Sequence, residues 1–262
     1  MHLATAKSCK ADTRSTLLHY NKYIKVKNMF NVQYAIDAFG ELLKGVPATV
    51  FITTVSILLG LVLGLVFAWI RIRKIPVASQ LIAALVSLIR STPILVQLYV
   101  VCYGMPRIIA FIHQQPELVS KITILPNTTA IITFTIYAAS YFGEIYRASF
   151  NSIEDGQLEA IQSFSLPRFA SMMRIIVPQA AVSAVPNLAN SSVDILKNTS
   201  LLYTISVMDI MAKAAVTALI GFRYLEVYTD ALIIYLILCI CYMVFFWIIE
   251  KFVVGRTARL MP

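Results

Sequence analysis

The sequence predicts an all-helical protein that crosses a membrane five times. Of its 262 residues, 59% are hydrophobic and 13% are charged, and the mean hydropathy is +0.77. Soluble domains carry about 25% charged residues, so a chain this poor in charge cannot cover a water-facing surface. One crossing needs about 20 apolar residues, and five segments approach or exceed that length. The formal charge of +9 fits this class, because cytoplasmic loops of membrane proteins collect Lys and Arg.

The N-terminal part of the chain is polar. Residues 1–44 hold seven Lys and Arg and no apolar core, so we expect no cleavable signal peptide. Met29 stands just before the hydrophobic pattern begins, and we expect residues 1–28 to be an upstream extension outside the native protein. The membrane domain is expected at residues 45–252, and a short tail at 253–262.

The clearest span is the uncharged run of 25 residues from Val46 to Ile70. At 1.5 Å per residue it is long enough to cross with some tilt. Gly60 and Gly64 have the GxxxG spacing that lets another helix approach closely. That helix could belong to the same subunit or to a second copy. Arg71 follows immediately and indicates the end of the span.

A second apolar region, residues 75–106, is interrupted only by Arg90. One interpretation is a span that begins near Ile75. The other is an amphipathic elbow up to Arg90, followed by a span from about Ser91. Because an arginine in the middle of a membrane is costly, we favour the second interpretation and expect a span near 88–106.

The third span is expected at 127–146, directly after Pro126, since a helix tolerates proline in its first turn. Residues 147–174 are too polar to cross. The fourth span is expected at 175–196, where two prolines and many polar residues predict a kinked helix.

The fifth span is the uncharged run 231–249, and the distribution of charge then predicts the orientation. Five crossings place the two termini on opposite sides. The segments after spans one, three and five hold ten Lys and Arg, whereas the opposing loops 107–121 and 201–226 hold four. This difference favours a cytoplasmic C-terminus. The basic residues of the N-terminal extension oppose it.

The fourth span carries polar residues at helical spacing. They recur at steps of four, three, four and three, which places them on one face of a helix. The face consists of Ser183, Asn187, Asn190, Asp194 and Lys197. Ionisable groups inside a membrane are expensive unless they are paired or solvated. The face therefore lines a protein interior or a water-filled path.

Two interpretations of this face remain open. Asp194 and Lys197 could simply neutralise one another as an i, i+3 pair. Alternatively, the face contacts a polar substrate that crosses the membrane, and Asp194 meets a cationic ammonium group.

The polar connection contains a motif that reaches into the fourth span. Gly156 and Gln157 precede Glu159-Ala160-Ile161, Ser165 follows four residues later, and Pro178 closes the motif. Further motifs occur in matching order, namely Lys44-Gly45-Val46-Pro47, Arg90-Ser91-Thr92-Pro93, Pro178-Gln179-Ala180 and Lys197-Asn198-Thr199-Ser200-Leu201. Together they resemble the permease subunits of binding-protein-dependent ABC importers, in particular the polar amino acid branch.

The resemblance implies the five-helix fold of a type I ABC importer permease. The loop at about 149–175 would form a short coupling helix that docks on a cytoplasmic ATPase, instead of only lying on the lipid headgroups. Ile161 and Ser165 depart from the Ala and Gly of the family motif. The implied coupling residues are Gly156, Gln157, Glu159, Ala160, Ile161, Ser165 and Leu166.

The substrate path is expected to be lined by the polar face of the fourth span and by a few residues of other spans. Glu144 could instead be an interfacial acid paired with Arg147. Tyr224, Glu226 and Tyr228 look similar to the cystine-type members. The expected path residues are Gln97, Tyr141, Glu144, Asn187, Asn190, Asp194, Lys197, Asn198, Thr199 and Ser200.

The sequence thus predicts a multi-pass permease of the bacterial cell membrane that imports a polar amino acid, with L-cystine as one candidate. The expected partners are a cytoplasmic ATPase dimer that binds ATP and Mg²⁺, an extracytoplasmic amino-acid-binding protein, a second permease and membrane lipid. No cofactor, metal site, catalytic group or nucleic-acid site is expected in this chain. The alternative function is an ion-coupled secondary transporter, which would need an internal inverted repeat.

Overall fold

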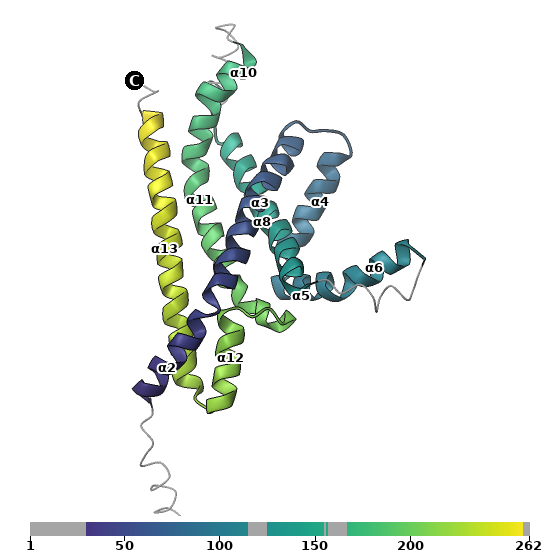
Figure 1. Ribbon diagram of the computed structural model, residues 1–262. Helices are drawn as coiled ribbons and strands as arrows, with labels where there is room; N and C mark the ends of the chain where they lie inside the picture. Colours follow the sequence, from purple (N-terminus) through teal and green to yellow (C-terminus); the bar gives the residue numbers. More distant parts are fainter. Residues whose placement is uncertain (1–29, 115–124, 155, 157–166, 259–262) are drawn as a thin grey trace, which may run out of the picture.

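The computed structural model describes residues 30–114, 125–154, 156 and 167–258 (Figure 1). Within these residues every regular element is a helix, which confirms the predicted all-helical class. Four long helices lie side by side: α3 (Val46–Ile72), α8 (Pro126–Asn151), α11 (Val177–Asn198) and α13 (Tyr224–Ala258). We call the end of this bundle where α3 and α13 finish the upper end, as drawn in Figure 1.

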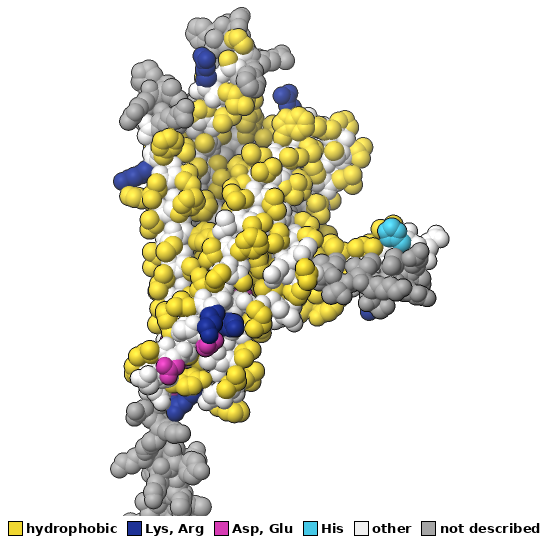
Figure 2. Space-filling model, in the orientation of Figure 1, with side chains coloured by type: hydrophobic (Ala, Val, Ile, Leu, Met, Phe, Trp, Pro, Cys, Tyr) yellow, Lys and Arg dark blue, Asp and Glu magenta, His cyan; other side chains and the backbone are white. Residues whose placement is uncertain are grey.

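The surface of the bundle matches a membrane environment. In Figure 2 the charged side chains gather near the two ends, and the face between them is largely apolar. Three helices of the described part are long and apolar enough to span a membrane, namely Val46–Ile72, Ile94–Ile112 and Tyr224–Gly255. The segments Met172–Ile205 and Ile210–Gly221 meet at 52° and could form a fourth, broken span. Helix α8 is more polar, and much of its surface is covered by its neighbours.

The GxxxG motif of α3 packs within the same chain. A Cβ atom on Gly60 would lie 2.4 Å from the Cβ of Ala138, and one on Gly64 would lie 3.0 Å from the backbone nitrogen of Gly143. Both contacts are tighter than ordinary van der Waals contacts, so these glycines let α3 and α8 approach closely. Of the two alternatives for this motif, the structure supports packing against a helix of the same subunit.

The second apolar region is divided at Pro93. Helix α4 (Ala78–Ser91) ends just before Thr92, because the residue before a proline disfavours helical geometry. The chain continues as α5 (Ile94–Tyr99), a π-helical segment η1 (Val100–Gly104) and α6 (Met105–Ile112). The expected span at 88–106 is thus wrong in its bounds, since it crosses this break. Helix α4 packs along α3 and α8 instead of forming a surface elbow, and α6 projects away from the bundle (Figure 1).

The fourth span is longer than expected and is preceded and followed by irregular helical segments. Helix α10 (Arg168–Ser171) leads into the π-helical segment η2 (Met172–Ile176) and then into α11. A 3₁₀ segment, η3 (Thr199–Ile205), follows, and α12 (Ile210–Gly221) occupies much of the region expected to be a loop. Pro186 lies inside α11, where its missing N–H weakens the helix.

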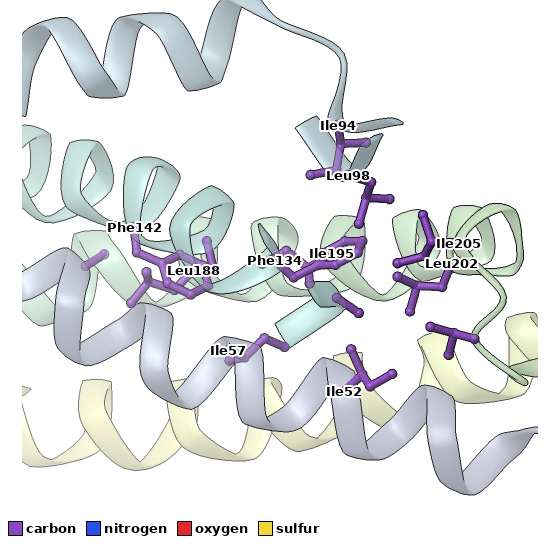
Figure 3. Packing of buried hydrophobic residues seen from close by; sticks show 14 residues of the cluster. Ile52, Ile57, Ile94, Leu98, Phe134, Phe142, Leu188, Ile195, Leu202 and Ile205 are labelled. Atoms are coloured by element: carbon purple, nitrogen blue, oxygen red, sulfur yellow. The ribbon is translucent and has the colours of Figure 1, made fainter. Parts of the chain in front are cut away.

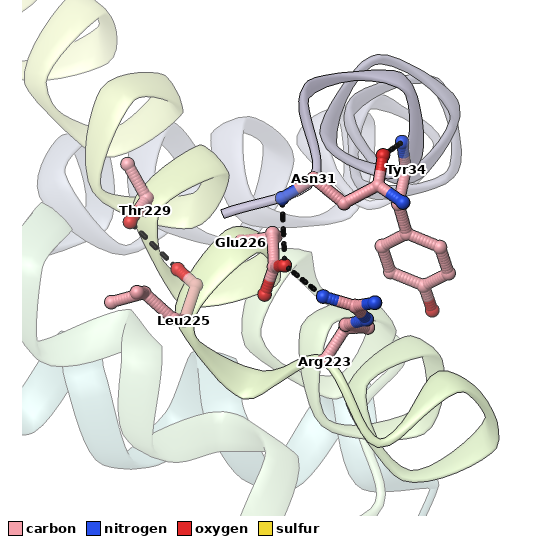
Figure 4. Close-up of polar contacts among 6 residues, drawn as sticks. All are labelled: Asn31, Tyr34, Arg223, Leu225, Glu226 and Thr229. Carbon is pink, nitrogen blue, oxygen red and sulfur yellow. Dashed lines mark hydrogen bonds and ion pairs between the residues drawn. The ribbon is translucent and has the colours of Figure 1, made fainter. Parts of the chain in front are cut away.

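A short helix, α2 (Val32–Leu43), belongs to the folded part although its sequence lies in the expected polar extension. Its Ala35, Ala38 and Leu42 are buried, and it packs on α12 and α13. Asn31 caps the helix by accepting from the Tyr34 backbone N–H at 3.1 Å. The backbone N–H of Asn31 donates to Glu226 Oε1 at 3.0 Å, and Arg223 donates to the same oxygen at 3.0 Å (Figure 4).

The main core fills the space between the long helices. In Figure 3, Phe134 and Phe142 of α8 lie among aliphatic side chains from α3, α5, α11 and η3. Leu98 and Leu202 are fully buried in this cluster, so α5 and η3 are anchored to the bundle. This core fixes α8 and α11 beside one another and thereby positions the polar residues of both helices.

Candidate substrate path and coupling region

The polar face predicted for the fourth span exists on α11 and is exposed. All five of its residues are exposed, whereas Ala184, Leu188, Val193 and Leu196 on other sides of the helix are buried. No described segment of the chain therefore covers this face. We use the name polar face for Ser183, Asn187, Asn190, Asp194 and Lys197.

The charged residues of the polar face form a loose pair. Lys197 Nζ lies 3.3 Å from Asp194 Oδ1, and the two side chains are 59% and 65% exposed. The neutralising pair considered from the sequence is therefore present. An exposed pair contributes only about 0–1 kcal/mol, so both groups can exchange it for another partner at little cost. Asn187 donates to the carbonyl oxygen of Ser183 at 3.0 Å.

Two tyrosines of α8 lie beside the polar face. The rings of Tyr137 and Tyr141 are 4.6 Å apart. Asn198 and the Asp194 carboxylate lie near the hydroxyl of Tyr137. The sequence predicted Tyr141 as a path residue but missed Tyr137, whose i, i+4 relation to Tyr141 was the available signal.

Arg90 approaches the same tyrosine pair from α4. Its guanidinium carbon lies 5.2 Å from the centre of the Tyr141 ring, within the range of a cation–π contact. The side chain of Arg90 is exposed. The structure thus brings together Arg90, the tyrosine pair and the charged end of the polar face.

Glu144 lies one helical turn from Tyr141 and is held by two arginines. Its Oε2 accepts from Arg147 Nη2 at 2.8 Å, and its Oε1 contacts Arg71 of α3. The side chains of Glu144 and Arg71 are 16% and 19% exposed. The pairing with Arg147 considered from the sequence is therefore observed, together with a second partner from α3.

Gln97 closes the corner between α4 and α5. Its side-chain nitrogen donates to the carbonyl oxygen of Ile89 at 2.7 Å and to that of Thr92 at 3.0 Å. These carbonyls belong to the end of α4, where helical partners are missing. The structure thus gives Gln97 a local bonding role, and its contact with a substrate stays a prediction.

The three polar residues after the polar face lie at the junction of α11 and η3. Thr199 is buried, and its hydroxyl donates to the carbonyl oxygen of Leu196 at 2.6 Å. Asn198 and Ser200 are half-buried. Of these three, Asn198 is the residue that reaches the tyrosine pair.

Most of the predicted coupling residues lie outside the described residues. These are Gln157, Glu159, Ala160, Ile161, Ser165 and Leu166. Gly156 is described and exposed. Helix α8 continues to Asn151, beyond the expected end of the third span at Arg147, so the connection begins later than expected. Both flanks of the connection, Asn151 and α10, lie at the upper end of the bundle (Figure 1).

A cavity of about 650 Å³ lies between the upper parts of α3, α8 and α11. Its lining is largely apolar and includes Trp69, Tyr146 and Ala184. No residue of the polar face lines it. This cavity is therefore separate from the predicted path, and a closed path along the polar face needs a second surface opposite α11.

Comparison with known proteins identifies the family of this chain. The family described as "Binding-protein-dependent transport system inner membrane component" matches residues 32–255. The probable amino-acid permease protein YxeN of Bacillus subtilis is 38% identical over 215 residues, which cover 82% of this chain and 92% of the relative. The L-cystine transport system permease protein TcyL of the same organism is 34% identical over 236 residues, covering 90% and 97%.

Solved structures share the fold. A crystal structure of an amino acid ABC transporter with histidines superposes with a TM-score of 0.73 at 23% identity, over 84% of this chain and 98% of that one. An inward-facing MetNI methionine ABC transporter gives a TM-score of 0.64 at 18% identity, over 81% and 96%. The chain therefore belongs to the family of inner membrane components of binding-protein-dependent transport systems, and it is the permease of an ATP-driven importer and not an enzyme.

Proposed function

We propose that this permease imports a polar amino acid along the polar face of α11. The exposed polar face on an otherwise apolar molecule carries the proposal. Polar groups in contact with lipid cost several kcal/mol each, about 2–4 for an amide or charge in hydrocarbon. A second permease, either an identical copy or a similar chain, supplies the opposite wall and removes this cost.

Asp194 is the residue expected to meet the ammonium group of the substrate. Its side chain is exposed, and its pairing with Lys197 is weak enough to be replaced. Tyr137, Tyr141 and Asn198 line the same region. Relatives named as amino-acid and L-cystine permeases support this substrate class, with L-cystine as a candidate.

ATP and Mg²⁺ would bind a cytoplasmic ATPase dimer, and an extracytoplasmic binding protein would deliver the substrate. The coupling loop at about 149–175 would dock on the ATPase through Glu159. The Lys and Arg in the segments after spans one, three and five support a cytoplasmic position for the upper end and the C-terminus. The contact with the ATPase therefore lies on the same side as the flanks of the loop.

The test uses proteoliposomes that contain the permease with its ATPase and binding protein, and it measures vanadate-sensitive uptake. Asp194→Asn removes the charge but keeps the shape. Loss of a charge-assisted hydrogen bond of about 1.5–3 kcal/mol should lower uptake at least about tenfold. Asp37→Asn, which changes an exposed acid of α2, is the matched control. Unchanged uptake by the Asp194 variant would refute the substrate role.

Two further measurements address coupling and energy source. Glu159→Lys should retain ATP hydrolysis and lose uptake, and normal uptake would contradict the docking. Uptake that follows an ion gradient without any ATPase would instead support the secondary transporter.

A further inference from the structure

In the described part of the chain, no acidic side chain pairs with the guanidinium of Arg90. It occupies the last turn of α4, its side chain is exposed, and its guanidinium lies on the ring of Tyr141 at 5.2 Å. Among the ion pairs of the described residues, none includes Arg90. A guanidinium inside or near a membrane is expensive unless an anion or water meets it.

The surrounding charges make this site favourable for an anion. Arg90 and Arg147 each lie close enough to Arg71 to repel it, and Glu144 is the acid that pairs with Arg71 and Arg147. Both carboxylate oxygens of Glu144 are already engaged, one by Arg71 and one by Arg147. The cluster therefore carries a surplus of positive charge. Arg90 is its arginine whose guanidinium nitrogens have no acidic partner among the described residues.

Arg90 also adjoins the predicted path. It contacts Tyr141, whose ring lies 4.6 Å from that of Tyr137, and Asn198 and Asp194 of α11 lie near the hydroxyl of Tyr137. Arg90 of α4 and Asp194 of α11 thus lie near the same pair of tyrosines on α8. One of these groups is cationic and the other is anionic.

We propose that Arg90 binds the α-carboxylate of the transported amino acid, with the rings of Tyr137 and Tyr141 beneath it. The planar guanidinium matches a carboxylate through two parallel hydrogen bonds. Arg90 is then a specificity residue that distinguishes amino acids from analogues that lack the carboxylate. The proposal rests on the proposed function, because it assumes that the polar face of α11 lines the path.

The experiment first identifies the substrate. Proteoliposomes with the complete importer receive an equimolar mixture of the twenty protein amino acids and L-cystine, and mass spectrometry identifies the amino acid that ATP drives inside. Binding of that amino acid and of its α-carboxamide is then measured on the permease–ATPase complex without the binding protein, so that the permease alone discriminates. The wild type should prefer the acid by about tenfold or more, the loss expected when a charge-assisted bond is removed.

Arg90→Gln should reduce this preference to about one, whereas Arg73→Gln, a matched change of an exposed arginine at the end of α3, should retain it. Asp194→Asn should weaken the binding of both the amino acid and its α-carboxamide and leave the ratio of the two affinities unchanged. Arg90→Lys keeps the charge but not the fork and should retain part of the preference, so it provides the test if the Gln variant does not fold. A wild-type ratio in the variants of Arg90 would overturn this proposal while the proposed function stands. Absence of ATP-driven uptake by the wild type would overturn both.

Discussion

Arg71 of α3 and Glu144 of α8 form an ion pair between two helices that also meet at a glycine contact, and about four fifths of each side chain is buried. Removing one member of a buried pair leaves the other charge unpaired, which costs about 3–5 kcal/mol when burial is complete. Because this pair is partly exposed, Glu144→Gln should lower the free energy of unfolding by about 1–3 kcal/mol. Thermal unfolding of the permease in detergent measures this change.

Glu41→Gln provides the control for this variant. Glu41 pairs with Lys44 on α2, and both side chains are well exposed. Equal losses of stability in the two variants would show that the pairing of Glu144 does not hold α3 and α8 together.

The contact of Gly60 with Ala138 predicts a pair of compensating substitutions. Gly60→Ala places a methyl group 2.4 Å from the Cβ of Ala138, and overpacking of this kind costs about 1–3 kcal/mol. Adding Ala138→Gly should restore most of the lost stability, because it removes the clashing atom. The control is Gly40→Ala, where no neighbouring atom lies within 4 Å, and it should be neutral or stabilising. A double variant no more stable than Gly60→Ala would contradict the contact.

Glu226 of α13 is expected to hold the start of α2 against the bundle. It accepts from the backbone N–H of Asn31 and from Arg223, and it is buried. Glu226→Ala should therefore release the start of α2, and hydrogen exchange of residues 31–43 should become faster. Asp37→Ala, on the exposed side of α2, should leave this exchange unchanged. Unaltered protection in the Glu226 variant would show that burial of Ala35, Ala38 and Leu42 alone holds the helix.

The hydrogen bonds of Gln97 are expected to keep the corner between α4 and α5 rigid. Gln97→Ala removes the hydrogen bonds of this side chain to the carbonyl oxygens of Ile89 and Thr92 at the end of α4. Each lost bond contributes about 0.5–1.5 kcal/mol to stability. We expect a lower unfolding temperature and faster exchange at Thr92 and the following residues. Gln33→Ala, which removes only a long exposed contact to Asp37, should change neither measurement. Normal stability with impaired uptake would instead assign Gln97 to the substrate.

The long uncharged runs were sufficient to predict α3 and α13 because span length follows directly from membrane thickness. The polar face was also predictable, since the spacing of Asn187, Asn190 and Asp194 places them on one side of any helix. Helix α2 was missed because its buried residues are Ala35, Ala38 and Leu42, a weak apolar stripe among charged residues. Helix α12 was missed because Lys213 interrupts a segment whose burial depends on α2 and α13.

The contacts between distant segments could not be predicted from one sequence. The pairing of Glu144 with Arg147 follows from their spacing in a helix, whereas its contact with Arg71 depends on how α3 and α8 pack. The position of Arg90 on Tyr141 likewise requires α4 to run along α8. The sequence left Arg90 with two interpretations, and the break at Pro93 shows why neither described α4 fully.

The π-helical segment η2 determines how α10 is rotated relative to the path. A π turn holds more residues than an α turn, and each residue of an α-helix corresponds to about 100° of rotation about the axis. Conversion of Met172–Ile176 to α-helical geometry would therefore turn α10 by about that angle relative to Asn187 and Asp194. The N–H of Val177, which donates to the carbonyl oxygen of Met172, would then donate to that of Met173. A change confined to this segment would therefore turn α10 about the helix axis while the later hydrogen bonds of α11 stay as they are.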